Sequence, residues 1–441
     1  MEPRSDDERD AGEIRILVVA ADYENISNLC HCCNQRYGLH IASRSKTLYF
    51  DNVKKQIILK KNEEHRIVAG HQWVFSNEVK SIRGDPVSGD LVELLRYDDK
   101  FLGLGFFNPH SLIAFRFLTN QEEEISAQFF ERRILDALQL RKRFYPQEET
   151  FRLVHGESDF LPGLVIDKYN EYLSVQALSF GMDQRMPMIC DVLEAQFHPK
   201  AIVERNDSPL RTLEHLPLRK KALRGTPEVT IINEDSCKFK VDVLNGQKTG
   251  FFLDQRENRN SIRAYVAGGE VLDCFCNEGA FSIHAALSKA RSVIGIDISE
   301  QAIANARVNA TLNATSNLTF ETLDVFDALK QHDESHKRFD VVILDPPSFT
   351  KSKKTVATAI HGYREINTLA LRLINRGGFL ISSSCSHHIT QESFLSMIIA
   401  SASRAKRSVQ MVEFGGAGPD HPIIPAMPET QYLKFGVFAV R

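Results

Sequence analysis

The sequence predicts a carboxyl-terminal α/β domain with a largely parallel, Rossmann-like sheet, preceded by a small all-β barrel and an α+β domain. The chain has 441 residues, enough for about three domains at roughly 150 residues each. Short apolar segments separated by Gly, Pro and Asn fill residues 56–119, which is typical of a small barrel. From about residue 236, strand-like and helix-like segments alternate, which indicates right-handed crossovers between parallel strands.

The amino-terminal part divides into three pieces. We expect residues 1–50 to form a poorly ordered extension, because they contain one strand-like run and no sustained periodicity. Residues 51–122 are expected to form the barrel, and residues 123–235 the α+β domain. An amphipathic helical segment over 121–144 joins the two. Within the α+β domain the predicted strands are 161–169, 172–178 and 200–205, around a helix at 186–197.

Residues 236–441 are expected to form the α/β domain. The predicted strands are 271–275, 293–297, 318–324, 341–345 and 378–385. The predicted helices are 280–290, 300–312 and 363–374. The carboxyl ends of parallel strands meet at one edge of a sheet, where open α/β sheets bind their ligands.

Charge and composition exclude several classes of protein. The formal net charge is −3 and the pI is about 6.6, which excludes a uniformly basic coat but not a local basic channel for nucleic acid. We find no apolar run of about 18 residues and no secretory signal, so neither a membrane span nor export is expected. The eight cysteines are scattered, which favours reduced thiols in a cytoplasm.

One cysteine cluster invites a zinc interpretation. Cys30, His31, Cys32 and Cys33 lie together near the amino terminus. A structural zinc site needs a second spaced pair of ligands, and none follows nearby. We therefore expect no bound metal.

The turn after the first strand of the α/β domain lacks the signature of a dinucleotide site. Residues 271–280 contain one glycine, Gly279, and so do not match G-x-G-x-x-G. An acidic strand end followed by a short turn with one glycine suits a ligand without a pyrophosphate, such as S-adenosylmethionine. We expect Asp273, Phe275, Asn277 and Gly279 to contact this cofactor.

Two further aspartates follow the next two strands. Asp297 lies 24 positions after Asp273, where a carboxylate can bind both ribose hydroxyls. Asp324 ends the third strand and can accept a hydrogen bond from the adenine amino group. We expect Ile298 and Val325, which directly follow these two aspartates, to contact the cofactor as well. Each aspartate alone is more often a helix N-cap or a turn residue. Three of them at successive strand ends favour a cofactor site.

The fourth strand ends at Asp345, and Pro-Pro-Ser-Phe follows it. Prolines stiffen the turn and fix the direction of the Asp345 carboxylate. That carboxylate can hydrogen-bond the polar edge of a flat base, with Pro346 beside it and Phe349 available for stacking. An ordinary strand-end turn is the alternative.

The fifth strand ends at Cys385. If the fourth and fifth strands are neighbours, Cys385 and Asp345 meet at the same edge of the sheet. A single cysteine is usually a buried structural residue. The position of Cys385 at a strand end instead favours a role as a nucleophile. That role requires the thiolate form. His387 and His388 follow at once, but adjacent residues of an extended chain point in different directions. We interpret both histidines as surface or supporting groups.

A dense mixture of charged, amide and aromatic residues precedes the α/β domain. Residues 246–256 read Gly-Gln-Lys-Thr-Gly-Phe-Phe-Leu-Asp-Gln-Arg, a composition that fits the wall of a cofactor or RNA cleft. We expect Asp254 to contact the cofactor, and Lys248 and Arg256 to contact an RNA substrate.

With these residues in place, the chain resembles the bacterial 23S (large-subunit) ribosomal RNA cytosine-C5 methyltransferase I family. The resemblance runs from about residue 55 to Arg441 and rests on HQWVFSNEV, GESDFLPGLVIDKY, GQKTGFFLDQR, DPPSF, GYREIN, SSSCS and DHPIIPAMPETQYLKF. It implies an RNA-binding PUA domain, a central α+β domain and a class I (Rossmann-like) S-adenosylmethionine-dependent methyltransferase domain.

The resemblance also implies a reaction. The enzyme would make 5-methylcytosine in large-subunit ribosomal RNA, with Cys385 attacking C6 and Asp345 hydrogen-bonding the ring edge. The target base would leave its stack to reach both groups. Many other RNA cytosine-C5 methyltransferases carry a second cysteine after the proline of this motif, where this chain has Pro347 and Ser348. The base that removes the C5 proton is therefore unassigned. A homodimer is a further expectation.

Two other functions stay open at this point. An RNA guanine or exocyclic-amine methyltransferase also uses an Asp-Pro-Pro motif and needs no cysteine nucleophile. A non-catalytic RNA-binding or ribosome assembly protein could keep the same fold, although the set of four aspartates and Cys385 weighs against it.

Overall fold

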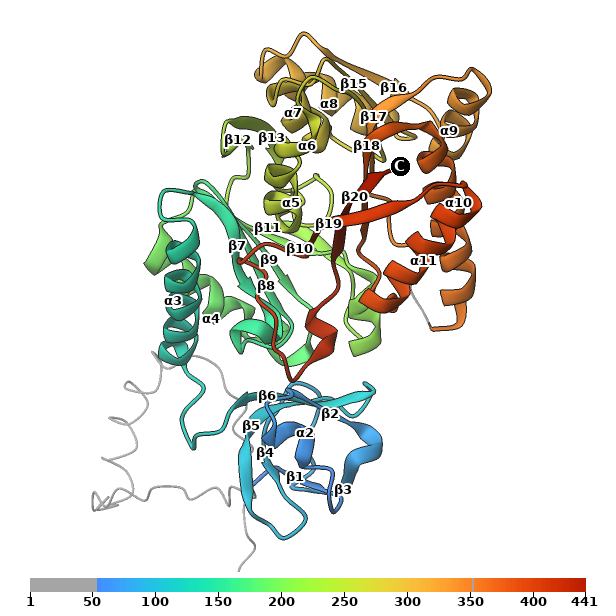
Figure 1. Ribbon diagram of the computed structural model, residues 1–441. Helices are drawn as coiled ribbons and strands as arrows, with labels where there is room; N and C mark the ends of the chain where they lie inside the picture. The colour runs from blue at the N-terminus through green and yellow to red at the C-terminus, as the bar shows by residue number, and fades with distance from the viewer. Residues whose placement is uncertain (1–53, 351–352) are drawn as a thin grey trace, which may run out of the picture. The chain divides into compact units, whose positions relative to one another are not determined.

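The computed structural model describes residues 54–350 and 353–441, and Figure 1 shows the sheets and the helices that cover them. The expected extension at 1–50 and the cysteine cluster at 30–33 lie outside the described residues. Within the described ranges, no helix combines the length and the apolar character that a membrane crossing requires.

The first described part of the chain is a six-stranded β domain. Its elements are β1 (Gln56–Leu59), α2 (His65–Val68), β2 (Trp73–Phe75), β3 (Val79–Arg83), β4 (Leu91–Leu95), β5 (Phe101–Phe107) and β6 (Ile113–Thr119). The strand order is β2-β6-β5-β4-β1-β3, and only the β1–β4 pair is parallel. Alternate residues such as Ile57 and Leu59, or Val92 and Leu94, face a common core. The prediction of a small all-β domain is confirmed.

The second part is an α+β domain with two long helices on one face of a five-stranded sheet. Its elements are α3 (Ala127–Phe144), β7 (Thr150–His155), β8 (Leu164–Tyr169), β9 (Tyr172–Ala177), α4 (Phe180–Phe197), β10 (Ala201–Asn206) and β11 (Arg219–Gly225). The strand order is β11-β10-β9-β8-β7. Phe130 of α3 and Met182 of α4 share one buried core with Ile166 of β8.

A two-stranded hairpin connects this domain to the third. Strands β12 (Val229–Glu234) and β13 (Cys237–Asp242) pair antiparallel. Phe239 of the hairpin is buried together with Tyr169 of β8 and with Ile283 of the next domain. The hairpin therefore packs between the two domains.

The third part is built on a seven-stranded sheet. Its strands are β14 (Glu270–Cys274), β15 (Ser292–Asp297), β16 (Leu318–Thr322), β17 (Phe339–Leu344), β18 (Ile374–Ser384), β19 (Val409–Gly415) and β20 (Lys434–Val440). The order is β16-β15-β14-β17-β18-β20-β19. The first five strands in this order are parallel, and β20 runs antiparallel to both of its neighbours.

Helices cover both faces of this sheet. They are α5 (Arg256–Ser261), α6 (Arg263–Val266), α7 (Ala280–Leu287), α8 (Glu300–Leu312), α9 (Val325–Glu334), α10 (Val356–Leu373) and α11 (Gln391–Arg404). On one face, Tyr363 of α10 and Phe394 of α11 belong to a core with Val342 of β17. On the other face, Phe281 of α7 and Val266 of α6 are buried with Val341 of the same strand.

The α/β prediction is confirmed, with corrections to its elements. Strand β16 ends at Thr322, two residues before the predicted end, because Asp324 caps the unpredicted helix α9. In the preceding α+β domain, helix α4 begins at Phe180 rather than 186, so Pro187 lies inside it instead of in its first turn. Helix α11 and strands β19 and β20 were also not predicted.

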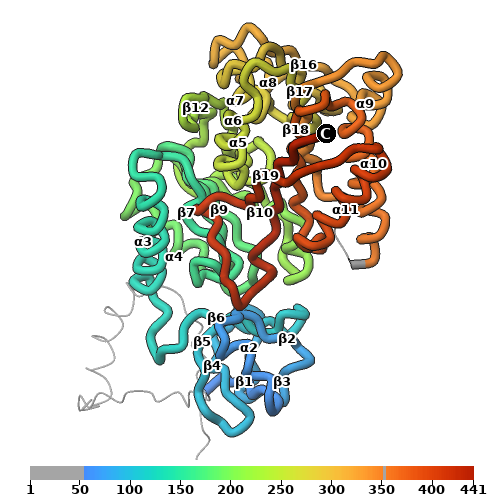
Figure 2. The backbone as a smooth tube through the Cα atoms, viewed as in Figure 1, coloured from blue at the N-terminus to red at the C-terminus, as the bar shows by residue number. Residues whose placement is uncertain are grey.

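A long loop between β19 and β20 runs back past the other domains, as the tube in Figure 2 shows. Its Asp420 accepts a hydrogen bond from the backbone N–H of Arg152 at 3.0 Å. Further along, Glu429 lies 3.4 Å from the ring of His71 in the β domain. The loop thus makes contacts with both preceding domains before it returns to the sheet.

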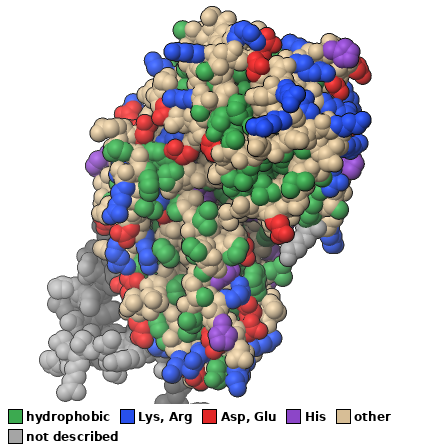
Figure 3. Space-filling model, viewed as in Figure 1, with side chains coloured by type: hydrophobic (Ala, Val, Ile, Leu, Met, Phe, Trp, Pro, Cys, Tyr) green, Lys and Arg blue, Asp and Glu red, His purple; other side chains and the backbone are tan. Residues whose placement is uncertain are grey.

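The net charge is nearly neutral, but positively charged side chains are concentrated in one region of the surface. Figure 3 shows Lys and Arg side chains gathered around the carboxyl-terminal end of the chain and α9. Burial and the charges of Arg338 and Arg376 lower the pKa of Arg407 in this region. The net charge of −3 is therefore the sum over surface regions of opposite charge.

Candidate active site

The carboxyl ends of five parallel strands meet at one edge of the large sheet. Strand β17 pairs with β14 on one side and with β18 on the other, so that Leu344 is level with Cys274 and Ser382. Asp345 directly follows β17, and Cys385 directly follows β18. The structure thus brings both residues to the edge where open α/β sheets bind ligands.

The turn between β14 and α7 contains residues with a left-handed backbone conformation. Phe275, Asn277 and Gly279 have φ angles of 63°, 49° and 80°, which are costly for residues that carry a Cβ. A Cβ on Gly279 would lie 2.6 Å from the ring of Phe320, so this position requires glycine. The backbone N–H of Asn277 donates a 3.0 Å hydrogen bond to Oδ2 of Asp297, which ties the turn to the end of β15.

Asp273 lies at the base of this turn with its carboxyl group fully buried. The Ser282 hydroxyl donates a 2.6 Å hydrogen bond to Oδ2, while Oδ1 has no hydrogen-bond partner among the described residues. Burial raises the pKa of Asp273 to about 7. A buried carboxyl oxygen without a partner is costly, and a ligand with an ammonium group or an N–H donor would satisfy it.

Asp297 and Ile298 present a polar and an apolar surface side by side. The Asp297 carboxylate accepts backbone hydrogen bonds from Asn277 and, at 2.9 Å, from Ser299. Ile298 is 69% exposed, which is unusual for a large aliphatic side chain next to a sheet edge. This pair suits a ligand with a hydroxylated part and a flat apolar part.

Asp324 is the N-cap of α9. Its Oδ1 accepts hydrogen bonds from the backbone N–H groups of Phe326 at 2.9 Å and Asp327 at 3.3 Å. Val325 is buried in the core beneath it. The N-cap alternative considered for the three aspartates thus describes what Asp324 does in the structure.

The segment before α5 contributes a second buried carboxylate to this edge. Asp254 Oδ2 accepts hydrogen bonds from the Tyr432 hydroxyl at 2.7 Å and the Lys248 ammonium at 3.3 Å. Its Oδ1 has no hydrogen-bond partner among the described residues. Burial would raise the pKa of Asp254, but the Lys248 and His421 charges hold it below its ordinary value.

Arg256, by contrast, points into the protein. Arg256 is 4% exposed, and its guanidinium donates a 2.6 Å hydrogen bond to the Thr150 carbonyl and lies 3.6 Å from Glu234. Tyr145 stacks on it at 4.7 Å. In the structure Arg256 therefore joins the second and third domains.

Asp345 is held by a residue that the sequence analysis did not single out. The side-chain amide of Gln255 donates a 2.8 Å hydrogen bond to Oδ1 of Asp345. Burial and the nearby Asp254 charge raise the pKa of Asp345 to about 6. Gln255 lies inside the quoted motif of residues 246–256, but the pattern did not show which side chain faces Asp345.

The loop after Asp345 is fixed to the segment after Cys385. Pro346 is buried, and the Phe349 ring packs on Tyr363 with a 4.5 Å separation of ring centres. The hydroxyls of Ser348 and Ser386 are 2.8 Å apart. The two catalytic candidates are therefore carried by loops that hydrogen-bond each other.

Cys385 is half-buried at this edge. Burial and the Asp345 charge raise the pKa of its thiol, while the Lys248 charge opposes them. The ring of the exposed His387 lies 5.3 Å from the ring of Tyr432, and His388 is half-buried.

Four other cysteines are buried, and their thiols have raised pKa values: Cys190, Cys237, Cys274 and Cys276.

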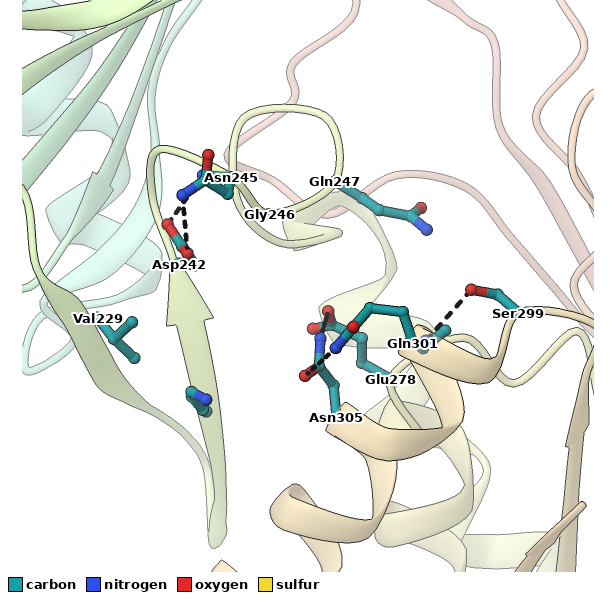
Figure 4. Close-up of a pocket in the computed structure, with 11 residues that line it drawn as sticks. Val229, Asp242, Asn245, Gly246, Gln247, Glu278, Ser299, Gln301 and Asn305 are labelled. Carbon is teal, nitrogen blue, oxygen red and sulfur yellow. Dashed lines mark hydrogen bonds between the residues drawn. The ribbon is translucent and has the colours of Figure 1, made fainter. Parts of the chain in front are cut away.

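A polar pocket of about 350 Å³ adjoins the same turn on the side of α8. Its polar lining comes from Lys240, Asp242, Asn245, Gln247, Glu278, Ser299, Gln301 and Asn305. Figure 4 shows Asn305 against Glu278, with a hydrogen bond of 2.9 Å, and Gln247 above them. Gln247 also accepts a 3.0 Å hydrogen bond from Asn277. Asp345 and Cys385 are not among the lining residues, so we place the chemistry at the sheet edge rather than here.

The residues at the sheet edge fit S-adenosylmethionine. The unpartnered oxygens of Asp273 and Asp254 are suited to its α-ammonium group, and the turn at 275–279 is closely packed and ends in a required glycine. Asp297 can accept from ribose hydroxyls, and exposed Ile298 can pack on an adenine.

Known proteins match the chain in both halves. A family model described as a PUA-like domain matches residues 57–120, and one described as a methyltransferase domain matches residues 266–417. The ribosomal RNA large subunit methyltransferase I of Shewanella denitrificans is 39% identical over 387 residues, covering 86% of this chain and 98% of that protein. The protein of the same name from Aeromonas hydrophila is 38% identical over 386 residues, covering 86% and 97%.

Solved structures show the same fold. A chain from Streptococcus mutans, provisionally described as a SAM-dependent methyltransferase, superposes with a TM-score of 0.75 at 21% identity, covering 87% of this chain and 99% of that one. A methyltransferase-like protein solved in complex with SAH gives a TM-score of 0.76 at 21% identity, covering 88% and 100%. At this identity the likeness concerns the fold alone.

The identity of 39% extends over nearly the whole length of the Shewanella protein. The chain belongs to the ribosomal RNA large subunit methyltransferase I family and is an S-adenosylmethionine-dependent methyltransferase.

Proposed function

We propose that this protein methylates C5 of a cytosine in large-subunit ribosomal RNA through a covalent bond between Cys385 and C6. One observation carries the proposal: Cys385 and Asp345 directly follow neighbouring parallel strands, at the edge that fits the cofactor. The substrate class follows from relatives that are named ribosomal RNA large subunit methyltransferases.

Each proposed cofactor residue is assigned to the part of S-adenosylmethionine that its side chain suits chemically. S-adenosylmethionine, when bound, supplies an electrophilic methyl group carried on a sulfonium. We assign its ammonium group to Asp273 and Asp254, its ribose to Asp297 and its adenine to the exposed side chain of Ile298. The sequence-based cofactor contact of Val325 stays a proposal, although this residue is buried. Asp324 stays a proposed contact of the adenine while it caps α9. The backbone at Phe275, Asn277 and Gly279 forms the wall of the site.

Cytosine C5 is a poor nucleophile, and attack by Cys385 makes it more nucleophilic. Its thiolate attacks C6, forming a sulfur–carbon bond and moving the electrons of the C5–C6 double bond onto C5. After methylation, removal of the C5 proton restores the double bond and breaks the sulfur–carbon bond, which regenerates the thiolate. The proton acceptor is not assigned.

Asp345 orients the base for this attack. Its carboxylate accepts a hydrogen bond from the exocyclic amine, and Gln255 fixes the position of that carboxylate. Lys248, Pro346 and Phe349 are proposed substrate contacts. For Arg256 we retain the sequence-based proposal of an RNA contact, although its guanidinium is buried.

The remaining domains are proposed to hold the RNA. We assign residues 51–122 to a PUA-like RNA-binding domain, 123–235 to the central domain and 236–441 to the methyltransferase domain. Methylation of an exocyclic amine would need no thiol at this edge, so the position of Cys385 favours C5. The homodimer stays a prediction.

Mapping of modified bases tests the proposal. Ribosomal RNA from cells that lack the gene should lose one 5-methylcytosine, which the wild-type gene should restore and Cys385→Ala should not. Cys190→Ala, which removes a buried thiol from helix α4 of the central domain, is the matched control and should restore the modification. Full restoration by Cys385→Ala would refute the covalent mechanism.

A further inference from the structure

Strand β20 begins with a buried lysine opposite the end of β18. In the antiparallel β18–β20 pair, Lys434 is level with Ser384, the residue before Cys385. The Lys434 side chain is 2% exposed. Its ammonium donates hydrogen bonds of 2.7 Å to the backbone carbonyls of Ser386 and Tyr432. The ammonium thus lies against the segment that carries Cys385.

Within the described part of the chain, this buried cation has no carboxylate partner. Among residues 54–350 and 353–441, no Asp or Glu forms an ion pair with Lys434, and two carbonyl oxygens are its hydrogen-bond acceptors. Burial lowers the pKa of Lys434 to about 8, and the charge of Cys385 opposes this effect. Buried ammonium groups are costly without an anion, and the hydrogen bond to Ser386 holds this one beside the segment that carries the Cys385 thiol.

The other charged groups around Cys385 do not supply a matching cation. Asp345 and Asp254 raise the pKa of the thiol, and Lys248 lowers it. Lys248 is 45% exposed and shared with Asp254. Tyr363 of α10 has its own pKa raised by burial and by the Cys385 charge. His387 and His388, from the same loop as Cys385, are at least partly open to solvent.

We propose that Lys434 is a positioning residue for Cys385, whose fixed ammonium stabilises the thiolate that attacks the base. The proton of the thiol passes to solvent, the thiolate remains beside the ammonium, and both carbonyl hydrogen bonds keep the ammonium in place. This proposal rests on the proposed function, because it assumes that Cys385 is the nucleophile. It assigns to Lys434 a role that the sequence motif alone did not indicate.

Alkylation of Cys385 tests the proposal without RNA or methyl transfer. The full-length protein is treated with iodoacetamide from pH 6 to pH 10, and modification is read by mass spectrometry on the tryptic peptide 377–404, which contains Cys385. For Lys434→Met we expect the midpoint of the rate profile to rise by about one pH unit, so that the rate near neutral pH falls about tenfold. Lys434→Arg keeps the charge and should retain the wild-type midpoint.

Two further variants separate charge from structure. Lys434→Gln can still donate to both carbonyls but has no charge, so its midpoint should shift as that of Lys434→Met does. Arg407→Met removes a half-buried cation that donates to the Ile374 carbonyl at the other end of β18, and its midpoint should not move. Melting temperatures confirm that each variant is folded.

The proposal is overturned if folded Lys434→Gln or Lys434→Met keeps the wild-type midpoint. It is also overturned if Arg407→Met produces the same shift, because the effect would then not depend on the position of the charge. Failure of the cytosine-C5 mechanism would appear separately, as full activity of Cys385→Ala.

Discussion

The side-chain amide of Gln255 donates a 2.8 Å hydrogen bond to Oδ1 of Asp345. The oxygen of the same amide accepts a 2.5 Å hydrogen bond from Asn258, so the amide cannot turn over without losing both contacts. Gln255 therefore presents a fixed donor to Asp345 and favours the ionised form of that carboxyl group. The segment before α5 and the loop after β17 meet at this bond.

Loss of the Gln255 donor should move the acid limb of the activity profile. The hydrogen bond opposes the burial that raises the pKa of Asp345 to about 6. Gln255→Leu should raise that pKa further, so that kcat falls at a higher pH than in the wild type. At pH 7 we expect kcat to fall by about 2- to 15-fold, because a hydrogen bond to a charged group contributes ~1.5–3 kcal/mol, or about one to two pKa units.

Methyl-transfer rates from pH 5 to pH 9 measure this shift. Gln176→Leu, which removes an amide bonded to the Arg205 carbonyl in the central sheet, serves as the control and should leave the profile unchanged. An unshifted acid limb in Gln255→Leu would show that Asp345 does not act as a carboxylate.

The ionised Asp345 carboxylate should lower the stability of the protein above about pH 6. Its pKa rises from an ordinary 3.8 to about 6 in the folded protein. The folded state thus binds the proton more tightly, so the free energy of unfolding falls as pH rises from about 4 to 6 and then stays low. Asp345→Asn should be more stable than the wild type at pH 8, by on the order of 1–3 kcal/mol, and equally stable near pH 4.

Urea unfolding at both pH values tests this prediction. Asp340→Asn is a control of opposite sign, because hydrogen bonds from the Glu270 N–H and Asn375 outweigh burial and hold the pKa of Asp340 below its ordinary value. That variant should lose stability at pH 8. A destabilised Asp345→Asn at pH 8 would contradict the account.

A buried ion pair should hold the hairpin to the methyltransferase domain. Arg259 donates hydrogen bonds of 2.6 and 2.5 Å to the two oxygens of Glu234, and both side chains are at most 2% exposed. His284 lies 3.1 Å from the same carboxylate. Glu234→Gln should lower the free energy of unfolding by about 3–5 kcal/mol, because it leaves a buried guanidinium uncompensated.

The matched control is the exposed pair of Lys200 and Glu171. Glu171→Gln should cost less than about 1 kcal/mol in the same urea titration. Equal losses in the two variants would show that burial does not govern the contribution of Glu234.

Gly279→Ala should impair cofactor binding through a steric clash. The φ of Gly279 is 80°, and a Cβ added at this position would lie 2.6 Å from the Phe320 ring, so the turn or the ring has to move. We expect a loss of about 1–3 kcal/mol of stability and at least a tenfold weaker affinity for S-adenosylmethionine in calorimetry. Gly268→Ala has a similar φ of 73° but nothing within 4 Å of its Cβ, so it should retain the affinity. Unchanged binding by Gly279→Ala would remove this turn from the cofactor site.

The sequence predicted the parts of the site that depend on order along the chain. Alternating strands and helices place Asp273, Asp297, Asp345 and Cys385 at strand ends, and parallel pairing then brings them to one edge. The structure adds that Asp324 is committed to the N-cap of α9. The sequence instead predicted a strand over residues 318–324 that ends at Asp324, because apolar residues recur up to Leu323.

The rest of the site depends on contacts between distant residues. Lys434 meets the Cys385 loop only because β20 enters the sheet antiparallel between β18 and β19, which the residues of either strand do not show. Gln255 and Tyr432 likewise reach the two acidic groups across 90 and 178 positions of sequence. Periodicity predicts local elements, whereas such pairs follow from the tertiary packing.

Covalent trapping tests the central claim most directly. The protein is mixed with S-adenosylmethionine and a large-subunit ribosomal RNA fragment that contains 5-fluorocytosine, whose fluorine cannot leave as a proton does. The account predicts a denaturant-resistant protein–RNA adduct in the wild type, mapped to Cys385 in the peptide 377–404, and no adduct in Cys385→Ala. An adduct of equal yield in Cys385→Ala, or methylation of unsubstituted RNA by that variant at the wild-type rate, would contradict it.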